Sequence, residues 1–231
     1  MSSAATSGDN SRSLFATPAI VADRRSDGSI LVRSITPLQP GTRCVGDWLE
    51  YWARQTPDKI FLGDRAGVDA PWSTVTYQDA LKQVRSAATW ILAQHLNAER
   101  PLVILSDNSV EHALLALAAQ HVGVPSAAIS PAYSLMSRDF DKLKGMIRLL
   151  EPGAIYVSGT RPFAAALAAI APLHSAAIVS GTPGDAGAIP FHAIAATPET
   201  SDVATAFGSI TPDTIAKFLF TSGSTGMPKG V

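Results

Sequence analysis

Residues 102–129 read LVILSDNSVEHALLALAAQHVGVPSAAI, and this stretch decides the fold class. A continuous apolar run at 102–105 precedes a segment with helical apolar spacing, from Glu111 to His121. We expect Asn108 to cap that helix, and Gly123-Val124-Pro125 to end it before a second apolar run. The stretch therefore predicts a strand, a helix and a second strand.

The same alternation continues toward the C-terminus. Helices are expected at 137–150 and 163–170, and strands at 154–157 and 176–179. Strands that are apolar on both faces and alternate with helices indicate an α/β fold, with a largely parallel sheet flanked by helices on both sides. A looser connection rich in Gly, Pro and Thr should follow from Ser180 to about Thr211.

The N-terminal region predicts a short tail and a small β element. Residues 1–16 are rich in Ser, Ala and Thr and are expected to be a disordered tail, with the domain spanning 17–231. Two apolar runs between Ala19 and Ile35 flank Asp27-Gly28, a dipeptide that suits a hairpin turn.

Two helices should connect this hairpin to the sheet. Val45, Trp48, Leu49 and Trp52 recur at three- and four-residue spacing before Pro57, which predicts an amphipathic helix whose two tryptophans face the core. A second helix should open at Thr76, with Asp79 three residues later as in a capping box, and reach about Leu96.

Composition excludes several classes of protein. Hydrophobic residues make up 46% of the 231 residues and charged residues 16%, too apolar a balance for a disordered interaction protein. With 18 Lys and Arg against 19 Asp and Glu, no global field attracts nucleic acid or an anionic membrane, so a bound anion must be held by a local site.

Cysteine usage and hydropathy predict the cellular setting. Cys44 is the single cysteine, which precludes an intrachain disulfide and fits a reducing cytoplasm. Two uncharged stretches, 113–137 and 162–184, are interrupted by Gly, Pro or His, so we expect buried elements of a soluble core rather than membrane spans.

The C-terminal residues 215–231 read IAKFLFTSGSTGMPKGV, which predicts a strand at 215–220 that leads into a loop of Gly, Ser and Thr. Gly223, Gly226 and Gly230 allow the backbone N–H groups to approach an anion closely. Lys229 adds positive charge. The hydroxyl donors of the loop are Thr221, Ser222, Ser224 and Thr225. This pattern indicates a phosphate-binding loop, and a flexible surface turn is the alternative.

Two common nucleotide motifs do not match this loop. The P-loop has glycine directly before its lysine and Ser or Thr directly after it, whereas this chain has Pro228 and Gly230. Gly223 and Gly226 also lack the spacing of the dinucleotide-binding fingerprint.

The Ser/Thr/Gly string ending in Pro228-Lys229-Gly230 resembles the adenylate-forming superfamily, which includes acyl-CoA synthetases, luciferases and nonribosomal peptide adenylation domains. The resemblance implies that Thr221, Ser222, Gly223, Ser224, Thr225, Gly226 and Lys229 bind the β- and γ-phosphates of ATP. It also implies ATP, Mg²⁺ and coenzyme A as cofactor and co-substrates, and a small carboxylic acid as substrate.

A narrower resemblance covers most of Arg43 to Val231. Residues 43–49, 108–113 and 130–135 are similar to feruloyl-CoA synthases, bacterial ligases for hydroxycinnamic acids. In the family, the adenine-binding and acidic Mg²⁺-associated motifs, the ribose-binding aspartate and the lysine of the mobile C-terminal domain follow the phosphate loop. We therefore expect residues 17–231 to be the truncated N-terminal part of an adenylation domain, inactive alone, whose catalytic set is incomplete.

Other readings of the sequence stay open. Within the superfamily, the chain could come from a fatty acyl-CoA or acyl-AMP ligase, or from an amino-acid adenylation domain; outside it, it could be a non-catalytic nucleotide-binding remnant. Ser106-Asp107-Asn108 lies where a strand meets a helix, a favoured place for ligand contacts, although capping also accounts for Asn108. The five histidines lack ligand spacing, so no metal site is expected.

Overall fold

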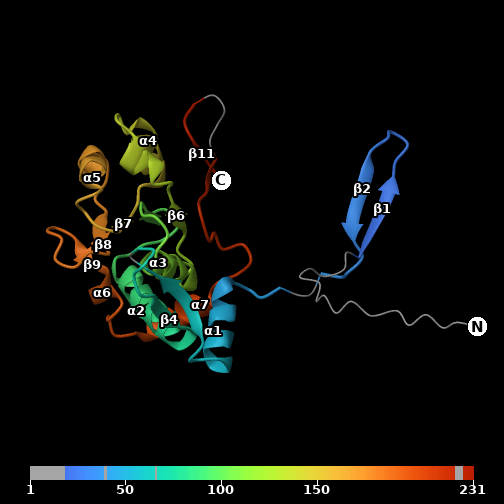
Figure 1. Cartoon of the computed structure of the whole chain (residues 1–231), viewed down its shortest axis with the longest axis horizontal. Coiled ribbons are helices and arrows are strands. Elements are labelled where there is room, and N and C mark those ends of the chain that lie inside the picture. The colour runs from blue at the N-terminus through green and yellow to red at the C-terminus, as the bar shows by residue number, and fades with distance from the viewer. Residues whose placement is uncertain (1–18, 39–40, 66, 222–225) are drawn as a thin grey trace, which may run out of the picture. The chain divides into compact units, whose positions relative to one another are not determined.

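The computed structural model describes residues 19–38, 41–65, 67–221 and 226–231 (Figure 1). The predicted tail at 1–16 lies outside them. The chain divides into two compact units, one up to Gly41 and one from Thr42 to Val231. Among the described residues, no helix is both long and apolar enough to cross a bilayer.

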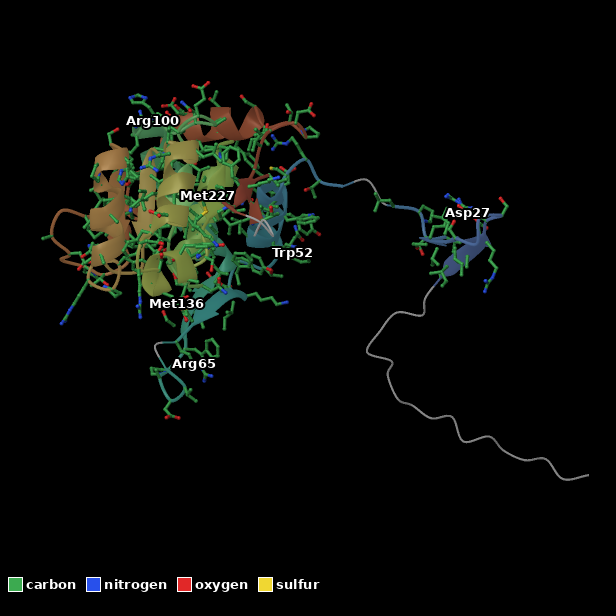
Figure 2. All side chains as sticks on the ribbon, turned by 90° about the horizontal axis from the view of Figure 1, so that it is seen from above. Asp27, Trp52, Arg65, Arg100, Met136 and Met227 are labelled. Carbon is green, nitrogen blue, oxygen red and sulfur yellow. The ribbon has the colours of Figure 1, made fainter. Side chains whose placement is uncertain are left out.

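The first unit contains the predicted hairpin, which is confirmed. Strands β1 (Ile20–Arg24) and β2 (Ile30–Ser34) pair antiparallel over five residues each. Gly28 has φ of +85°, a conformation that costs glycine little, and the Asp27 carboxylate, labelled in Figure 2, accepts a hydrogen bond of 2.9 Å from the Ser29 N–H. The turn chemistry of the sequence thus fixes the hairpin register.

The second unit is built on a parallel sheet, as the sequence predicts. Within the described residues it has five strands in the order β6-β5-β7-β8-β9, all paired in parallel. The strands are β5 (Leu102–Ile104), β6 (Ser126–Ala128), β7 (Ala154–Val157), β8 (Ala177–Ser180) and β9 (Ile189–Pro190). After β5 the chain adds β6 on one side, and it then adds β7, β8 and β9 on the other side. The topological switch point of the sheet therefore lies between β5 and β7.

Helices cover both faces of the sheet (Figure 1). Alternate residues of β5 point to opposite sides, so Leu102 and Ile104 join one core and Val103 joins the other. The first core includes α2 (Tyr77–Ala93) and α3 (Val110–His121), and the second includes α4 (Asp141–Leu150) and α5 (Ala164–Ile170).

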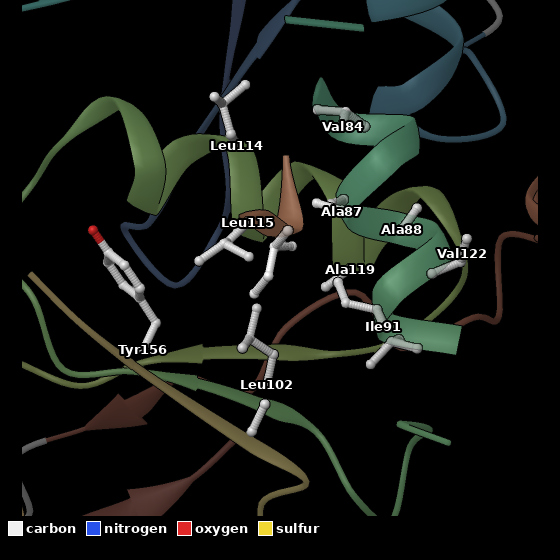
Figure 3. Packing of buried hydrophobic residues seen from close by; sticks show 14 of the residues in the cluster. Val84, Ala87, Ala88, Ile91, Leu102, Leu114, Leu115, Ala119, Val122 and Tyr156 are labelled. Atoms are coloured by element: carbon white, nitrogen blue, oxygen red, sulfur yellow. The ribbon is translucent and has the colours of Figure 1, made fainter. Parts of the chain in front are cut away.

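Small side chains let α2 and α3 pack closely over the sheet. Figure 3 shows Ala87 and Ala88 of α2 beside Ala119 of α3, above Leu102 and Tyr156 of the strands. Each of these residues is at most 1% exposed. Burial of the Tyr156 ring raises the pKa of its hydroxyl to about 12.

Helix α1 (Val45–Gln55) forms where expected, but its tryptophans do not face the core. Trp48 is 55% exposed and Trp52 43%, whereas Leu49 and Ala53 are buried. Figure 2 labels Trp52 at the surface. Gly46 faces the interior, and its missing side chain leaves room for Phe207. A Cβ at position 46 would lie only 2.6 Å from the Phe207 ring. Gly46, Leu49 and Ala53 therefore make the buried stripe of α1, whereas the helical spacing had predicted that the tryptophans lie there.

Two predicted helix ends are wrong. Helix α2 begins as expected, since the Thr76 hydroxyl accepts a 3.1 Å hydrogen bond from the Asp79 N–H. It ends at Ala93 rather than at Leu96, because His95 adopts φ of +55° and turns the chain. Ser109, and not Asn108, caps α3 by accepting a 3.1 Å hydrogen bond from the His112 N–H.

The helix predicted at 137–150 begins later than expected, and a separate short element precedes it. A π-helix spans Ala132–Met136, and α4 starts only at Asp141 because Phe140 has φ of +57°, outside the helical region. The predicted helix at 163–170 corresponds to α5, which a 3₁₀ turn at Ala171–Leu173 continues.

The region predicted as a loose connection, 180–211, is more ordered than expected. It contains β9, α6 (Phe191–Ile194) and α7 (Ser201–Gly208), whose Val203 is buried against the first core. The strand predicted at 215–220 is also wrong in extent. Only Lys217 forms an isolated parallel bridge, with Ser126, and β10 is limited to Phe220–Thr221.

A second antiparallel pair, β3 (Ile60–Asp64) and β4 (Ser73–Thr76), leads into α2. Phe61 of β3 stacks on Tyr77 with ring centroids 4.6 Å apart. This contact fixes the start of α2 against β3.

Candidate phosphate-binding hairpin

The predicted phosphate loop is the connection of a short antiparallel hairpin. Strand β10 pairs with β11 (Lys229–Gly230), with Phe220 opposite Gly230 and Thr221 opposite Lys229. Leu219 and Val231 exchange two backbone hydrogen bonds of 2.8 Å and extend this pairing. The predicted site residues Ser222, Gly223, Ser224 and Thr225 lie outside the described residues.

The two faces of this hairpin differ in character. Phe220 is half-buried and packs against the second core, and its ring lies beside Gly230 on the opposite strand. Because residues directly opposite each other in a β-pair share a face, Thr221 and Lys229 project from the other face, and both are exposed. The hairpin thus brings a hydroxyl and an ammonium group together at the base of the loop.

Lys229 is available to a ligand. Among the described residues, no carboxylate lies within ion-pairing distance of its ammonium group, whereas Lys144 on α4 pairs with Asp141 at 3.3 Å. Apart from its chain neighbours, no described residue has an atom within 4 Å of where a Cβ of Gly226 would be. A cation, a hydroxyl and an unobstructed glycine backbone at one loop are suited to an anion.

A polar pocket lies at the carboxyl ends of β5 and β6. It has a volume of about 290 Å³ and is lined by Ser106, Asp107, Asn108, His112 and Ser130, among others. The Ser106 hydroxyl lies 3.3 Å from His112 Nδ1, which is also 3.2 Å from the Asp107 carbonyl. The sequence had indicated Ser106 to Asn108 as a favoured place for ligands, but not His112, which the first turn of α3 brings back to the strand end.

Oxygen and nitrogen donors elsewhere do not gather into a metal site. In the part of the chain that the structure describes, no three His, Cys, Asp or Glu residues are placed to hold a metal ion together. The Asp185 carboxylate instead accepts 2.6 Å hydrogen bonds from the Ser180 hydroxyl and the Thr160 N–H, and these lower its pKa. Asp185 thereby ties the loop after β8 to the loop after β7.

Comparison with protein families identifies the group to which this fold and loop belong. The family model of the AMP-binding enzymes matches residues 49–231, which include the sheet, its helices and the hairpin. The chain belongs to the AMP-binding enzyme family. A search of curated proteins finds no match.

Solved structures of adenylate-forming enzymes share the fold of this AMP-binding family member. Acetoacetyl-CoA synthetase from Streptomyces lividans has a TM-score of 0.65 at 19% identity, over 81% of this chain and 30% of that one. VinN has a TM-score of 0.61 at 20% identity, over 84% and 44%. The fatty acyl-adenylate ligase from L. pneumophila, solved with acyl adenylate and pyrophosphate, has 0.55 at 17% identity, over 81% and 30%.

The chain spans less than half the length of these structures. Its fold matches the N-terminal part of adenylate-forming enzymes, which agrees with the α/β class and the parallel sheet predicted from the sequence.

Proposed function

We propose that this chain supplies the triphosphate-binding part of an ATP-dependent acid–CoA ligase. The observation that supports the proposal is the β10–β11 register, which sets Thr221 opposite Lys229 at the base of the Ser/Gly/Thr loop. Thr221, Gly226 and Lys229, together with Ser222 to Thr225, would hold the β- and γ-phosphates of ATP.

The loop would act on the leaving group of the reaction. A carboxylate oxygen of the acid attacks the α-phosphorus of ATP, and the bond to the β-phosphate oxygen breaks and releases pyrophosphate. The thiolate of coenzyme A then attacks the acyl carbon and releases AMP. Charge accumulates on the departing phosphates, so donors fixed in advance around them lower the barrier of the first step. Mg²⁺ bound to the phosphates would supply further neutralisation of that charge.

The acid substrate is proposed to be a hydroxycinnamic acid, as in feruloyl-CoA synthases. Support comes from the likeness of residues 43–49, 108–113 and 130–135 to those enzymes. Of these, residues 108, 112, 130 and 131 line the pocket at the ends of β5 and β6. A fatty acyl ligase or an amino-acid adenylation domain would prefer a different acid. Activity of a longer form of the protein with ferulate, a fatty acid and phenylalanine would therefore distinguish the three kinds of enzyme.

We further propose that residues 17–231 form the N-terminal part of an adenylation domain, that the chain works in a reducing cytoplasm, and that by itself it does not complete adenylation. Purified 1–231 should give no ATP–pyrophosphate exchange with ferulate. Detectable exchange would overturn the last of these proposals.

Binding of MgATP by the chain, measured by titration calorimetry, tests the central proposal. Replacing Lys229 by Ala should weaken binding roughly tenfold or more, because a hydrogen bond to a charged group contributes about 1.5–3 kcal/mol. Lys59→Ala is the matched control: Lys59 is also exposed, and the substitution removes the same charge at the start of β3. Equal affinity in both variants would refute the role of Lys229.

The alternative function is that of a non-catalytic nucleotide-binding remnant. Such a protein would bind MgATP in the same way, but no longer form of it would make acyl-CoA. Acyl-CoA formation by a form that contains the rest of the domain would exclude it. Absence of MgATP binding in every form would refute both functions.

A further inference from the structure

Helix α4 carries a notch that faces the phosphate loop. Gly145 lies in the middle of α4, where glycine costs about 1 kcal/mol relative to alanine. A Cβ at this position would lie only 2.0 Å from Cε of Met227. The methyl end of Met227 therefore occupies the space that a side chain at position 145 would fill.

The hairpin touches α4 a second time, one turn further along. A Cβ at Gly230 would lie 3.5 Å from Cδ2 of Leu149, which is four residues after Gly145 and so on the same helix face. Lys229 is thus bracketed by Met227 and Gly230, both of which contact α4. Figure 1 shows the C-terminal hairpin beside α4, and Figure 2 labels Met227.

Helix α4 is a firm support for these contacts. Leu143, Met146 and Ile147 are each at most 1% exposed and belong to the second core. Pro228, between Met227 and Lys229, is buried and has a fixed φ. Because Pro228 is rigid, the position of Met227 against α4 constrains the position of Lys229.

We propose that Met227 is a positioning residue, which seats in the Gly145 notch of α4 and so holds Lys229 in the position from which it binds a triphosphate. This inference rests on the proposed function of the loop. The contact also gives a reason for glycine at position 145 in the middle of α4, because a larger residue would leave no room for the Met227 side chain.

A double-mutant cycle with inorganic tripolyphosphate as the probe tests the proposal. In the full chain, Gly145→Leu fills the notch and Met227→Ala empties it. Each should weaken tripolyphosphate binding roughly three- to tenfold, because Lys229 must then be held in place at the expense of binding energy. The double variant should lose no more than the worse single variant, since both changes remove one contact.

Two further measurements separate positioning from a loss of fold. Gly208→Leu is the control, because Gly208 also lies in a helix and has no atom within 4 Å of its absent Cβ. It should bind as the unaltered chain does. The methyl resonance of Met227, labelled with ¹³C, should shift in Gly145→Leu while the thermal unfolding midpoint stays within a few degrees. Met227→Leu should restore most of the affinity lost in Met227→Ala.

The outcomes are distinct. Unaltered tripolyphosphate affinity in Gly145→Leu, or losses that multiply in the double variant, would refute the positioning role alone. Failure of the unaltered chain to bind tripolyphosphate would refute the proposed function and the inference with it. In that case the change of the Met227 methyl resonance in Gly145→Leu would still show whether Met227 occupies the Gly145 notch.

Discussion

Lowering the pH should destabilise the second unit through one buried histidine. His121, at the end of α3, is 2% exposed and stacks on Phe207 of α7 with ring centroids 4.1 Å apart. Its Nδ1 atom is buried and has no hydrogen-bond partner among the described residues. Glu50 lies 3.8 Å from Nε2. The perturbation is protonation of this ring.

The size of the effect follows from the pKa of His121. Burial lowers it from 6.5 to about 4, against the opposing attraction of Glu50, while the charge of Arg85 lowers it further. Because the folded-state pKa lies below the unfolded value, the stabilisation is complete above pH 6.5 and is lost as the pH falls toward 4. The difference of 6.5 − 4, about 2.5 pH units, corresponds to about 3 kcal/mol in full and about 2 kcal/mol by pH 5.

Urea unfolding followed by circular dichroism at pH 7.5 and pH 5 measures this loss. His121→Phe provides the reference, because it keeps a planar ring against Phe207 and removes the titrating group while all other carboxylates and histidines remain. The unaltered chain should lose about 2 kcal/mol more than this variant between the two pH values. Equal losses would show that Glu50 stabilises the protonated ring enough to cancel the cost of its burial, and that His121 does not set the pH dependence.

Further predictions concern α1 and α3, and urea unfolding checks each of them. Ser109→Ala should lower the free energy of unfolding by about 1 kcal/mol through loss of the α3 cap. Asn108→Ala should leave it nearly unchanged. A larger loss in Asn108→Ala than in Ser109→Ala would show that Asn108 is the cap. Leu49→Ala should cost about 2–5 kcal/mol because it opens a cavity in the first core, whereas Trp48→Ser, at an exposed position, should change stability by less than about 0.5 kcal/mol. A larger cost at Trp48 than at Leu49 would contradict the observed face of α1.

Much of the fold could be predicted because local patterns and tertiary demands agree. The strands at 102–105 and 154–157 are apolar on both faces, and only the interior of a parallel sheet buries both. The Asp27-Gly28 turn and the Thr76 cap depend on hydrogen bonds within three residues, so sequence alone sufficed. The Ser/Gly/Thr loop and Lys229 were proposed as a phosphate site from composition and order, and that role stays a prediction.

The remaining features depend on partners that are distant in the sequence. Which face of α1 is buried was decided by Phe207, whose ring fits over Gly46 and leaves Trp48 outside. The strand predicted at 215–220 lacks a continuous partner, since β6 offers it only the bridge at Ser126.

Periodicity and residue type are enough to specify the α/β alternation, the parallel sheet and the chemical nature of the loop. The packing of distant segments sets Thr221 opposite Lys229, and it brings Met227 to Gly145, which lies 82 residues earlier in the chain. Such pairings arise from the way a hairpin packs on a helix, and no local pattern carries that geometry.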